Sequence, residues 1–232
     1  MSAYRGVLLD VEGTTTPITF VTEVLFPFAR ERLREACGRA DPRIEEAVAL
    51  LEEEHAAEAP PEVPEFGDGS AYASYLMDRD RKSTGLKALQ GVIWEEGYAG
   101  GELKAPVFPD VPQALRVWHA SGKQIHIYSS GSVLAQKLLF AHTDHGDLTP
   151  YLDGYHDTRV GGKREAESYR KIQRAMNVRA EETLFLSDVV EELDAAREAG
   201  MGTGLVRRPG NPEVAAGGHP VWTDFLGGLG AT

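Results

Sequence analysis

The chain has 232 residues, 42% of them hydrophobic, which is enough to fill one large domain or a core domain with a smaller one beside it. Its 24 basic and 36 acidic residues give a net charge of −12, with no pronounced Lys/Arg cluster, so nucleic acid and anionic membranes are not expected partners. No stretch approaches the roughly 20 apolar residues of a membrane span, no secretory signal pattern begins the chain, and Cys37 is its only cysteine, so we expect a cytoplasmic protein without an intrachain disulfide.

Apolar runs of strand type recur along the chain, and helical patterns follow most of them. The expected strands are Gly6–Leu9, Gln124–Tyr128, Gly154–His156, Thr183–Leu186 and Thr203–Val206. The expected helices among them are Val133–His142, Ala166–Met176 and Val190–Ala199. Because strand and helix alternate, the sequence predicts an α/β fold with a parallel sheet and helices on both faces. A last short element is expected within Pro220–Leu226.

The segment from about Phe20 to Leu103 interrupts this alternation because it contains no convincing strand. Its helical patterns are Thr22–Ala36, interrupted at Pro27, then Pro42–Ala57, Ser70–Asp80 and Leu86–Tyr98. A loop rich in proline, glycine and acids is expected at Ala59–Gly69, and a proline-containing return to the core at Glu102–Pro112. We therefore expect residues 19–103 to form an inserted α-helical cap, and residues 1–18 with 104–232 to form the core domain.

Polar residues stand at the ends of four predicted core strands. In chain order they are Asp10 and Glu12, Ser129 and Ser130, Lys163 after a glycine-containing loop, and Ser187-Asp188. Open α/β sheets bind their ligands at the carboxyl ends of the strands, so these side chains form one candidate site.

The residue types in this candidate site suit phosphate chemistry. A carboxylate such as Asp10 can accept a phosphoryl group and later release it to water. Mg²⁺ held by Asp10 and Asp188 would relieve the repulsion between that carboxylate and the phosphate, and Lys163 adds a second positive charge. Ser130 and neighbouring backbone N–H groups can donate to phosphate oxygens. Glu12 can protonate the leaving oxygen and then deprotonate the attacking water.

Each residue alone has a simpler interpretation. Asp188 could merely cap the helix that follows it, and Lys163 could be a solvated surface lysine. Glu191 and Glu192 are expected to be first-turn acids favoured by the helix dipole rather than ligands. The order of the whole set on four strand ends makes the joint site the better hypothesis.

Other templates do not fit the chain. Gly162-Lys163 is followed by Arg164 rather than Ser or Thr, and Asp157 stands where a P-loop needs its first glycine. No HExxH motif is present.

These positions resemble the haloacid dehalogenase-like hydrolase superfamily, whose members have a Rossmann-like core and an aspartyl nucleophile. The usual second acid is Asp, and here it is Glu12 within Asp10-Val-Glu-Gly-Thr-Thr-Thr-Pro-Ile18. Together with Phe20–Ala29, Tyr128-Ser-Ser-Gly-Ser132 and Phe185-Leu-Ser-Asp-Val189, this motif is similar to the enolase-phosphatase family of methionine salvage. The resemblance covers nearly the whole chain.

The resemblance implies a small phosphorylated diketone, 2,3-diketo-5-methylthiopentyl-1-phosphate, as the substrate of a monomeric enzyme. It implies enolisation first and then loss of phosphate to give the acireductone. By position, Mg²⁺ would be held by Asp10, the backbone carbonyl of Glu12 and Asp188. The substrate would be bound by Ser129, Ser130 and Lys163.

Alternatives remain open at this point. A related Mg²⁺-dependent sugar-phosphate phosphatase or phosphomutase is the first, although such enzymes usually have Asp where Glu12 stands. A non-catalytic binding protein is the second, and the intact set of Asp10, Glu12, Lys163 and Asp188 argues against it. Glu12 is also the candidate base for enolisation, because its longer side chain reaches farther than that of Asp.

Aromatic residues of the expected cap could line a site for the methylthio end of the substrate. Packing between the cap helices is nevertheless the favoured interpretation. The residues concerned are Phe20, Phe26, Tyr72, Tyr75 and Trp94.

Overall fold

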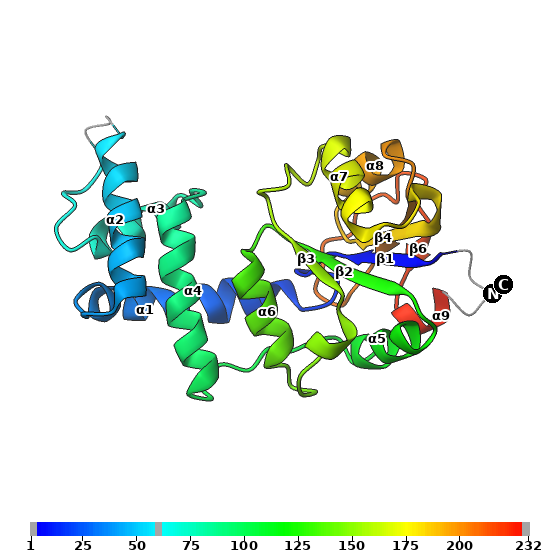
Figure 1. The fold of residues 1–232 in the computed structure, drawn as a ribbon, viewed down its shortest axis with the longest axis horizontal. Coiled ribbons are helices and arrows are strands. Elements are labelled where there is room, and N and C mark those ends of the chain that lie inside the picture. Colours follow the sequence, from blue (N-terminus) through cyan, green and yellow to red (C-terminus); the bar gives the residue numbers. More distant parts are fainter. Residues whose placement is uncertain (1–3, 59–61, 229–232) are drawn as a thin grey trace. The chain divides into compact units, whose positions relative to one another are not determined.

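The computed structural model describes residues 4–58 and 62–228 and contains a six-stranded sheet (Figure 1). The strands are β1 Gly6–Leu9, β2 Gln124–Tyr128, β3 Gly154–His156, β4 Thr183–Ser187, β5 Gly202–Val206 and β6 Val221–Trp222. Their order in the sheet is β3-β2-β1-β4-β5-β6, and every neighbouring pair is parallel. The predicted α/β fold with a parallel sheet is therefore confirmed, and β6 is the short last element.

Helices cover both faces of this sheet. On one face lie α7, Ala166–Met176, and α8, Val190–Glu198, while α5, Val111–Ala120, and α9, Phe225–Gly228, lie on the other (Figure 1). Helix α6, Val133–Ala141, packs against β3. Short 3₁₀ turns precede β3 and β4, at Thr149–Tyr151 and Ala180–Glu182. Strands that are buried on both sides are expected to be continuously apolar, as β1 is with all four of its residues buried.

One helix of the core was missed by the sequence analysis. The prolines of Glu102–Pro112 predict a return to the core without a helix, but α5 begins within this segment at Val111. Pro112 is tolerated there because the first turn of a helix needs no N–H donor at that position. The buried side chains Val111, Ala114, Leu115 and Trp118 follow the spacing of one helical face.

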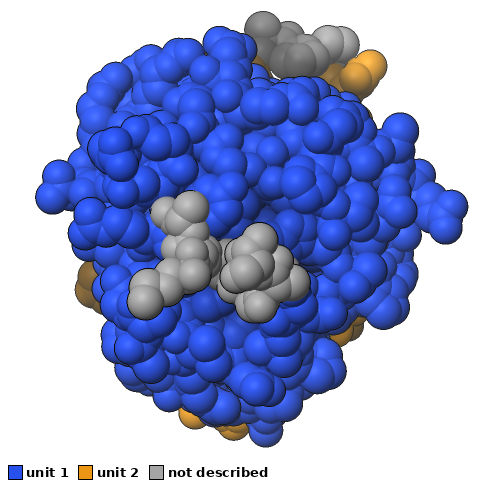
Figure 2. All heavy atoms as spheres, turned by 90° about the vertical axis from the view of Figure 1, so that its right-hand side faces the viewer, with its two compact units in different colours: residues 1–21, 104–232 blue, residues 22–103 orange. Residues whose placement is uncertain are grey.

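The chain divides into two compact units, residues 1–21 with 104–232 and residues 22–103, coloured separately in Figure 2. In its described residues the second unit contains helices and loops and no strand. A π-helical turn at Phe20–Leu25 leads into α1, Phe26–Cys37, and then follow α2, Pro42–Ala56, α3, Ser70–Asp78, and α4, Thr84–Ala99. Residues 59–61 of the predicted loop lie outside the described residues. The predicted core and cap, with boundaries at 18/19 and 103/104, stay a prediction.

Two helices of the second unit, α2 and α4, begin at residues whose side chains cap them. Asp41 accepts from the Arg43 backbone N–H at 2.8 Å at the start of α2, and Ser83 accepts from the Leu86 N–H at 2.9 Å at the start of α4. Helix α3 ends two residues earlier than expected, because Asp80 adopts a left-handed backbone conformation with a φ of 47°.

The aromatic residues expected in the cap mostly pack inside the second unit. Tyr72, Tyr75 and Trp94 are all buried. The rings of Tyr72 and Tyr75 stack at 6.1 Å, and the Trp94 indole donates to the carbonyl of Leu25. Packing between helices, the favoured interpretation, is confirmed for these three residues. No helix in the part of the chain that the structure describes is long and apolar enough to cross a membrane.

A buried ion pair joins three separate parts of the first unit. The side chain of Arg208, after β5, is only 3% exposed, and it makes two parallel hydrogen bonds of 2.7 and 3.0 Å to Asp110, which precedes α5. Asp110 also accepts from the backbone N–H of Phe225 at the start of α9. The guanidinium group lies 4.5 Å from the centre of the Phe108 ring and 4.6 Å from that of Phe225.

Asp110→Ala is expected to lower the free energy of unfolding by about 3–5 kcal/mol, because it leaves the Arg208 guanidinium buried without its counter-charge. Urea unfolding of the full chain measures this loss. The matched control is Glu181→Ala, which breaks an exposed ion pair with Arg179 and should cost no more than about 1 kcal/mol. Equal losses in the two variants would contradict the role assigned to the buried pair.

Candidate active site

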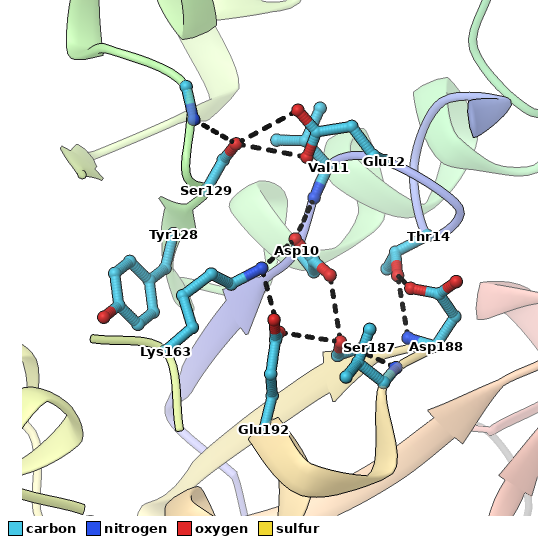
Figure 3. Close-up of polar contacts among 12 residues, drawn as sticks. Asp10, Val11, Glu12, Thr14, Tyr128, Ser129, Lys163, Ser187, Asp188 and Glu192 are labelled. Atoms are coloured by element: carbon cyan, nitrogen blue, oxygen red, sulfur yellow. Dashed lines mark hydrogen bonds and ion pairs between the residues drawn. The ribbon is translucent and has the colours of Figure 1, made fainter. Parts of the chain in front are cut away.

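Three neighbouring strands end at the candidate site. Strand β1 is flanked by β2 and β4, and Leu9 is in register with Ile127 and Leu186. Asp10 therefore emerges level with the ends of both neighbours. Ser129 follows β2 and Asp188 follows β4, so the predicted residues of these three strands do lie together (Figure 3).

Asp10 is 2% exposed, and three donors hold its carboxylate. Its Oδ1 accepts from the backbone N–H of Val11 at 2.8 Å and from Lys163 Nζ at 2.6 Å. Its Oδ2 accepts from Ser187 Oγ at 2.9 Å. These contacts fix the orientation of the side chain predicted to be the nucleophile.

Lys163 reaches Asp10 from the loop after β3, and two tyrosines support that loop. Tyr128 OH donates to the carbonyl of Gly161 at 2.9 Å, and Tyr169 OH donates to the carbonyl of Lys163 at 2.7 Å. Both rings belong to the core beside α7 and α8 and meet edge to face at 5.5 Å. The loop that carries the lysine is thus tied to a rigid hydrophobic core.

Glu192 is a site residue that the sequence analysis missed. The sequence predicts a first-turn acid favoured by the helix dipole rather than a ligand, but Glu192 is 8% exposed, and its Oε2 lies 2.8 Å from Lys163 Nζ and 3.1 Å from Ser187 Oγ. Burial and then the charge of Asp10 raise the pKa of Glu192 to about 8, against the opposing effect of Lys163. No local signal distinguishes Glu192 from Glu191, which lies beside it in the first turn of α8.

The charge of Lys163 is maintained by its two carboxylate neighbours. Burial alone would lower the pKa of its ammonium group, but the charges of Asp10 and Glu192 raise that pKa well above its usual value. The structure therefore places a permanent positive charge directly beside Asp10.

Asp188 is held by two residues that the sequence analysis did not identify. Its backbone N–H donates to Thr14 Oγ1 at 3.1 Å, and its Oδ2 accepts from Asn211 Nδ2 at 3.1 Å. Burial and then the charge of Asp10 raise the pKa of Asp188 to about 7. Gly13 makes the close approach possible: its φ is +75°, and a Cβ there would collide with the Asp188 carboxylate.

Glu12 and Ser129 connect the ends of β1 and β2. Ser129 Oγ lies 3.1 and 3.3 Å from the two Glu12 carboxylate oxygens and accepts from the backbone N–H of Gly131 at 3.0 Å. Burial and then the charge of Asp10 raise the pKa of Glu12. Ser130, the next residue of the same loop, is exposed.

The donor set fits a divalent cation. Asp10 lies close enough to Asp188 to raise its pKa, and a cation between the two carboxylates would relieve this repulsion. Within residues 4–58 and 62–228, no group of three or more His, Cys, Asp or Glu side chains is arranged to hold a metal ion. Proteins nevertheless usually bind Mg²⁺ with only one or two carboxylates, and substrate oxygens and water complete the coordination.

Comparisons with known proteins agree with this chemistry. Residues 4–200 match the family model of the haloacid dehalogenase-like hydrolases. The enolase-phosphatase E1 of Synechococcus elongatus is 50% identical over 217 residues, covering 90% of this chain and 91% of the relative. That of Stenotrophomonas maltophilia strain R551-3 is 49% identical over 212 residues, covering 88% and 87% of the two chains.

Solved structures have the same fold. The UTR4 protein of Saccharomyces cerevisiae is 38% identical, with a TM-score of 0.81 and coverage of 97% of this chain and 99% of that one. A second structure is that of CbbY of Rhodobacter sphaeroides, a D10N mutant in complex with xylulose-(1,5)bisphosphate. It has a TM-score of 0.62 at 19% identity, and the match covers 97% of this chain and 96% of that one. At this identity the likeness supports the fold alone. The chain belongs to the enolase-phosphatase E1 group of the haloacid dehalogenase-like hydrolases and is a phosphatase.

Proposed function

We propose that the protein enolises 2,3-diketo-5-methylthiopentyl-1-phosphate and then dephosphorylates the enol to the acireductone, a step of methionine salvage. The observation that carries the proposal is the buried Asp10 carboxylate, fixed beside Lys163 with Glu12 two residues farther along the same strand end. The relatives that bear the name enolase-phosphatase E1 support the substrate. The core and cap division at residues 18/19 and 103/104 belongs to the same proposal.

The proposed metal is Mg²⁺, held by the carboxylates of Asp10 and Asp188 and by the backbone carbonyl of Glu12. When bound, it neutralises the phosphate and acts as a Lewis acid for the developing enolate oxygen. Ser129, Ser130 and Lys163 bind the substrate, and Ser129 also holds Glu12 at the same strand ends. The oligomeric state expected from the family is a monomer.

In the enolase step, a base removes a proton from C1 of the substrate, and the C2 carbonyl oxygen takes a proton from water to become the enol hydroxyl. We assign the base to Glu12, the acid that replaces the usual aspartate. In the phosphatase step, a carboxylate oxygen of Asp10 bonds to phosphorus while the bond between phosphorus and the ester oxygen on C1 breaks. Glu12 protonates that oxygen and then takes a proton from the water that releases phosphate from Asp10. The raised pKa of Glu12 suits a group that must hold and return a proton.

The proposal is tested by mixing the full chain with the diketo phosphate and Mg²⁺ and following enol absorbance and free phosphate together. Enol is expected to rise before phosphate. Asp10→Asn is expected to abolish phosphate release, because the amide cannot accept the phosphoryl group, while enol accumulates. Phosphate release from generic sugar phosphates, with no reaction of the diketone, would instead favour the alternative phosphatase. Near-normal release by Asp10→Asn would refute the aspartyl-phosphate mechanism.

Glu12→Gln should slow phosphate release by about 10²–10⁴-fold, the usual contribution of general acid–base catalysis. If Glu12 is also the enolisation base, enol formation should slow in the same variant. Stopped-flow absorbance on substrate with Mg²⁺ separates the two rates. Enol formation at the wild-type rate would place that base elsewhere.

Metal removal should make stability depend on pH in a defined direction. Raised carboxyl pKa values favour the protonated folded state, so their contribution to stability is complete below about pH 4. It is lost as pH rises through about 7 for Asp188 and about 8 for Glu192. The melting temperature in EDTA is therefore expected to fall between pH 5.5 and pH 8.5, and Mg²⁺ should reduce this fall because it favours the ionised carboxylates.

Asp188→Asn is the matched variant for this measurement. It should show a smaller fall of melting temperature with pH in EDTA and little stabilisation by Mg²⁺. Identical pH dependence and identical Mg²⁺ stabilisation in the wild type and in Asp188→Asn would contradict the assignment of Asp188.

A further inference from the structure

The loop after β5 returns to the turn that follows Asp10. Asn211 in this loop is half-buried, and its Nδ2 donates to the carbonyl of Gly13 at 2.8 Å and to Asp188 Oδ2 at 3.1 Å. From this contact we infer that Asn211 is a positioning residue: it occupies Oδ2 of Asp188 and turns Oδ1 toward the metal. The inference rests on the proposed metal site.

The chemistry of the amide suits this task. Both neighbours of Asn211 Nδ2 are oxygen acceptors, so the amide nitrogen and not its oxygen must face them. One N–H is anchored on the rigid backbone at Gly13, which aims the other at the carboxylate of Asp188. Because the amide is neutral, it orients the carboxylate without competing with a cation for its charge. A lysine at this position would neutralise Asp188 and repel a metal ion.

The turn around Gly13 is shaped for this contact. A Cβ on Gly13 would collide with the Asp188 carboxylate and would lie 3.1 Å from Asn211 Nδ2. The backbone at Gly13, the carboxylate of Asp188 and the amide of Asn211 are therefore in direct contact. The other oxygen, Asp188 Oδ1, has a 3.5 Å contact with the hydroxyl of Thr14, at the limit of a hydrogen bond.

The loop is held in place independently of the Asn211 side chain. Arg208 Nε donates to the carbonyl of Thr14 at 3.0 Å, and the same guanidinium is paired with Asp110. The backbone N–H of Asn211 donates to the carbonyl of Arg208. Removal of the amide should therefore leave the loop where it is and act mainly on the orientation of Asp188.

The test measures Mg²⁺ binding directly, by calorimetric titration of the metal-free full chain with MgCl₂ and no substrate. Asn211→Ala removes both donors, and Asn211→Leu removes them while keeping the side-chain volume. Both variants are expected to bind Mg²⁺ about 10-fold more weakly, the low end of the usual cost of losing a partner that orients a metal ligand. At saturating Mg²⁺, kcat for phosphate release should stay within about twofold of the wild type, because the chemistry of the site is intact.

Glu213→Ala is the control, since Glu213 is an exposed residue of the same loop, and its Mg²⁺ affinity should equal that of the wild type. Wild-type affinity in both Asn211 variants would overturn the inference and leave the proposed metal site standing. A loss in the Ala variant alone would also overturn it, because that result would assign the effect to side-chain volume. Absence of Mg²⁺ binding by the wild type would remove the proposed metal site itself.

Discussion

The excess of negative charge at the ends of β1 and β4 is the constraint on which the rest of the site depends. Asp10, Glu12, Asp188 and Glu192 gather around one buried cation, Lys163, and burial raises the pKa of three of the four carboxyls. Buried charges are costly unless they are paired and hydrogen-bonded. The surrounding donors are accordingly neutral hydroxyls, amides and backbone N–H groups. These donors orient the carboxylates without neutralising them, so the excess negative charge remains available to a bound cation, which can also contact an anionic substrate.

The sheet explains why this charge collects at one point. The chain runs from β1 toward β2 and β3 on one side, and then crosses to β4 and β5 on the other, so the connections diverge between β1 and β4. Ligands bind at such switch points because the diverging loops leave a crevice at the carboxyl ends of the strands. Asp10 and Asp188 stand on the two strands that flank it. Parallel strands also align their ends closely, which is why residues far apart in the sequence, such as Asp10 and Ser187, can share a 2.9 Å hydrogen bond.

The sequence predicted the site residues that stand directly after a strand. Five strands were predicted to within one residue at either end, and this was sufficient to bring Asp10, Ser129 and Asp188 together. The sequence did not predict the site residues whose role depends on burial in the folded chain. Two adjacent first-turn glutamates have the same local preference, and only the folded chain distinguishes the buried Glu192. Asn211 lies in a loop whose path no local pattern encodes. Helix α5 has a regular apolar face, but its neighbouring prolines favoured a loop.

The central position of β1 has a consequence for synthesis. Gly6–Leu9 is made before its partner strands, which begin only at Gln124 and Thr183, whereas residues 22–103 form a compact unit of their own. The nascent chain must therefore carry this apolar segment without a partner strand until at least Gln124 has been made, a state prone to aggregation. Arg5 and Asp10 bracket that segment with opposite charges, as gatekeeper residues do. The carboxylate that the folded enzyme buries is, in the growing chain, a charge directly beside this exposed apolar segment.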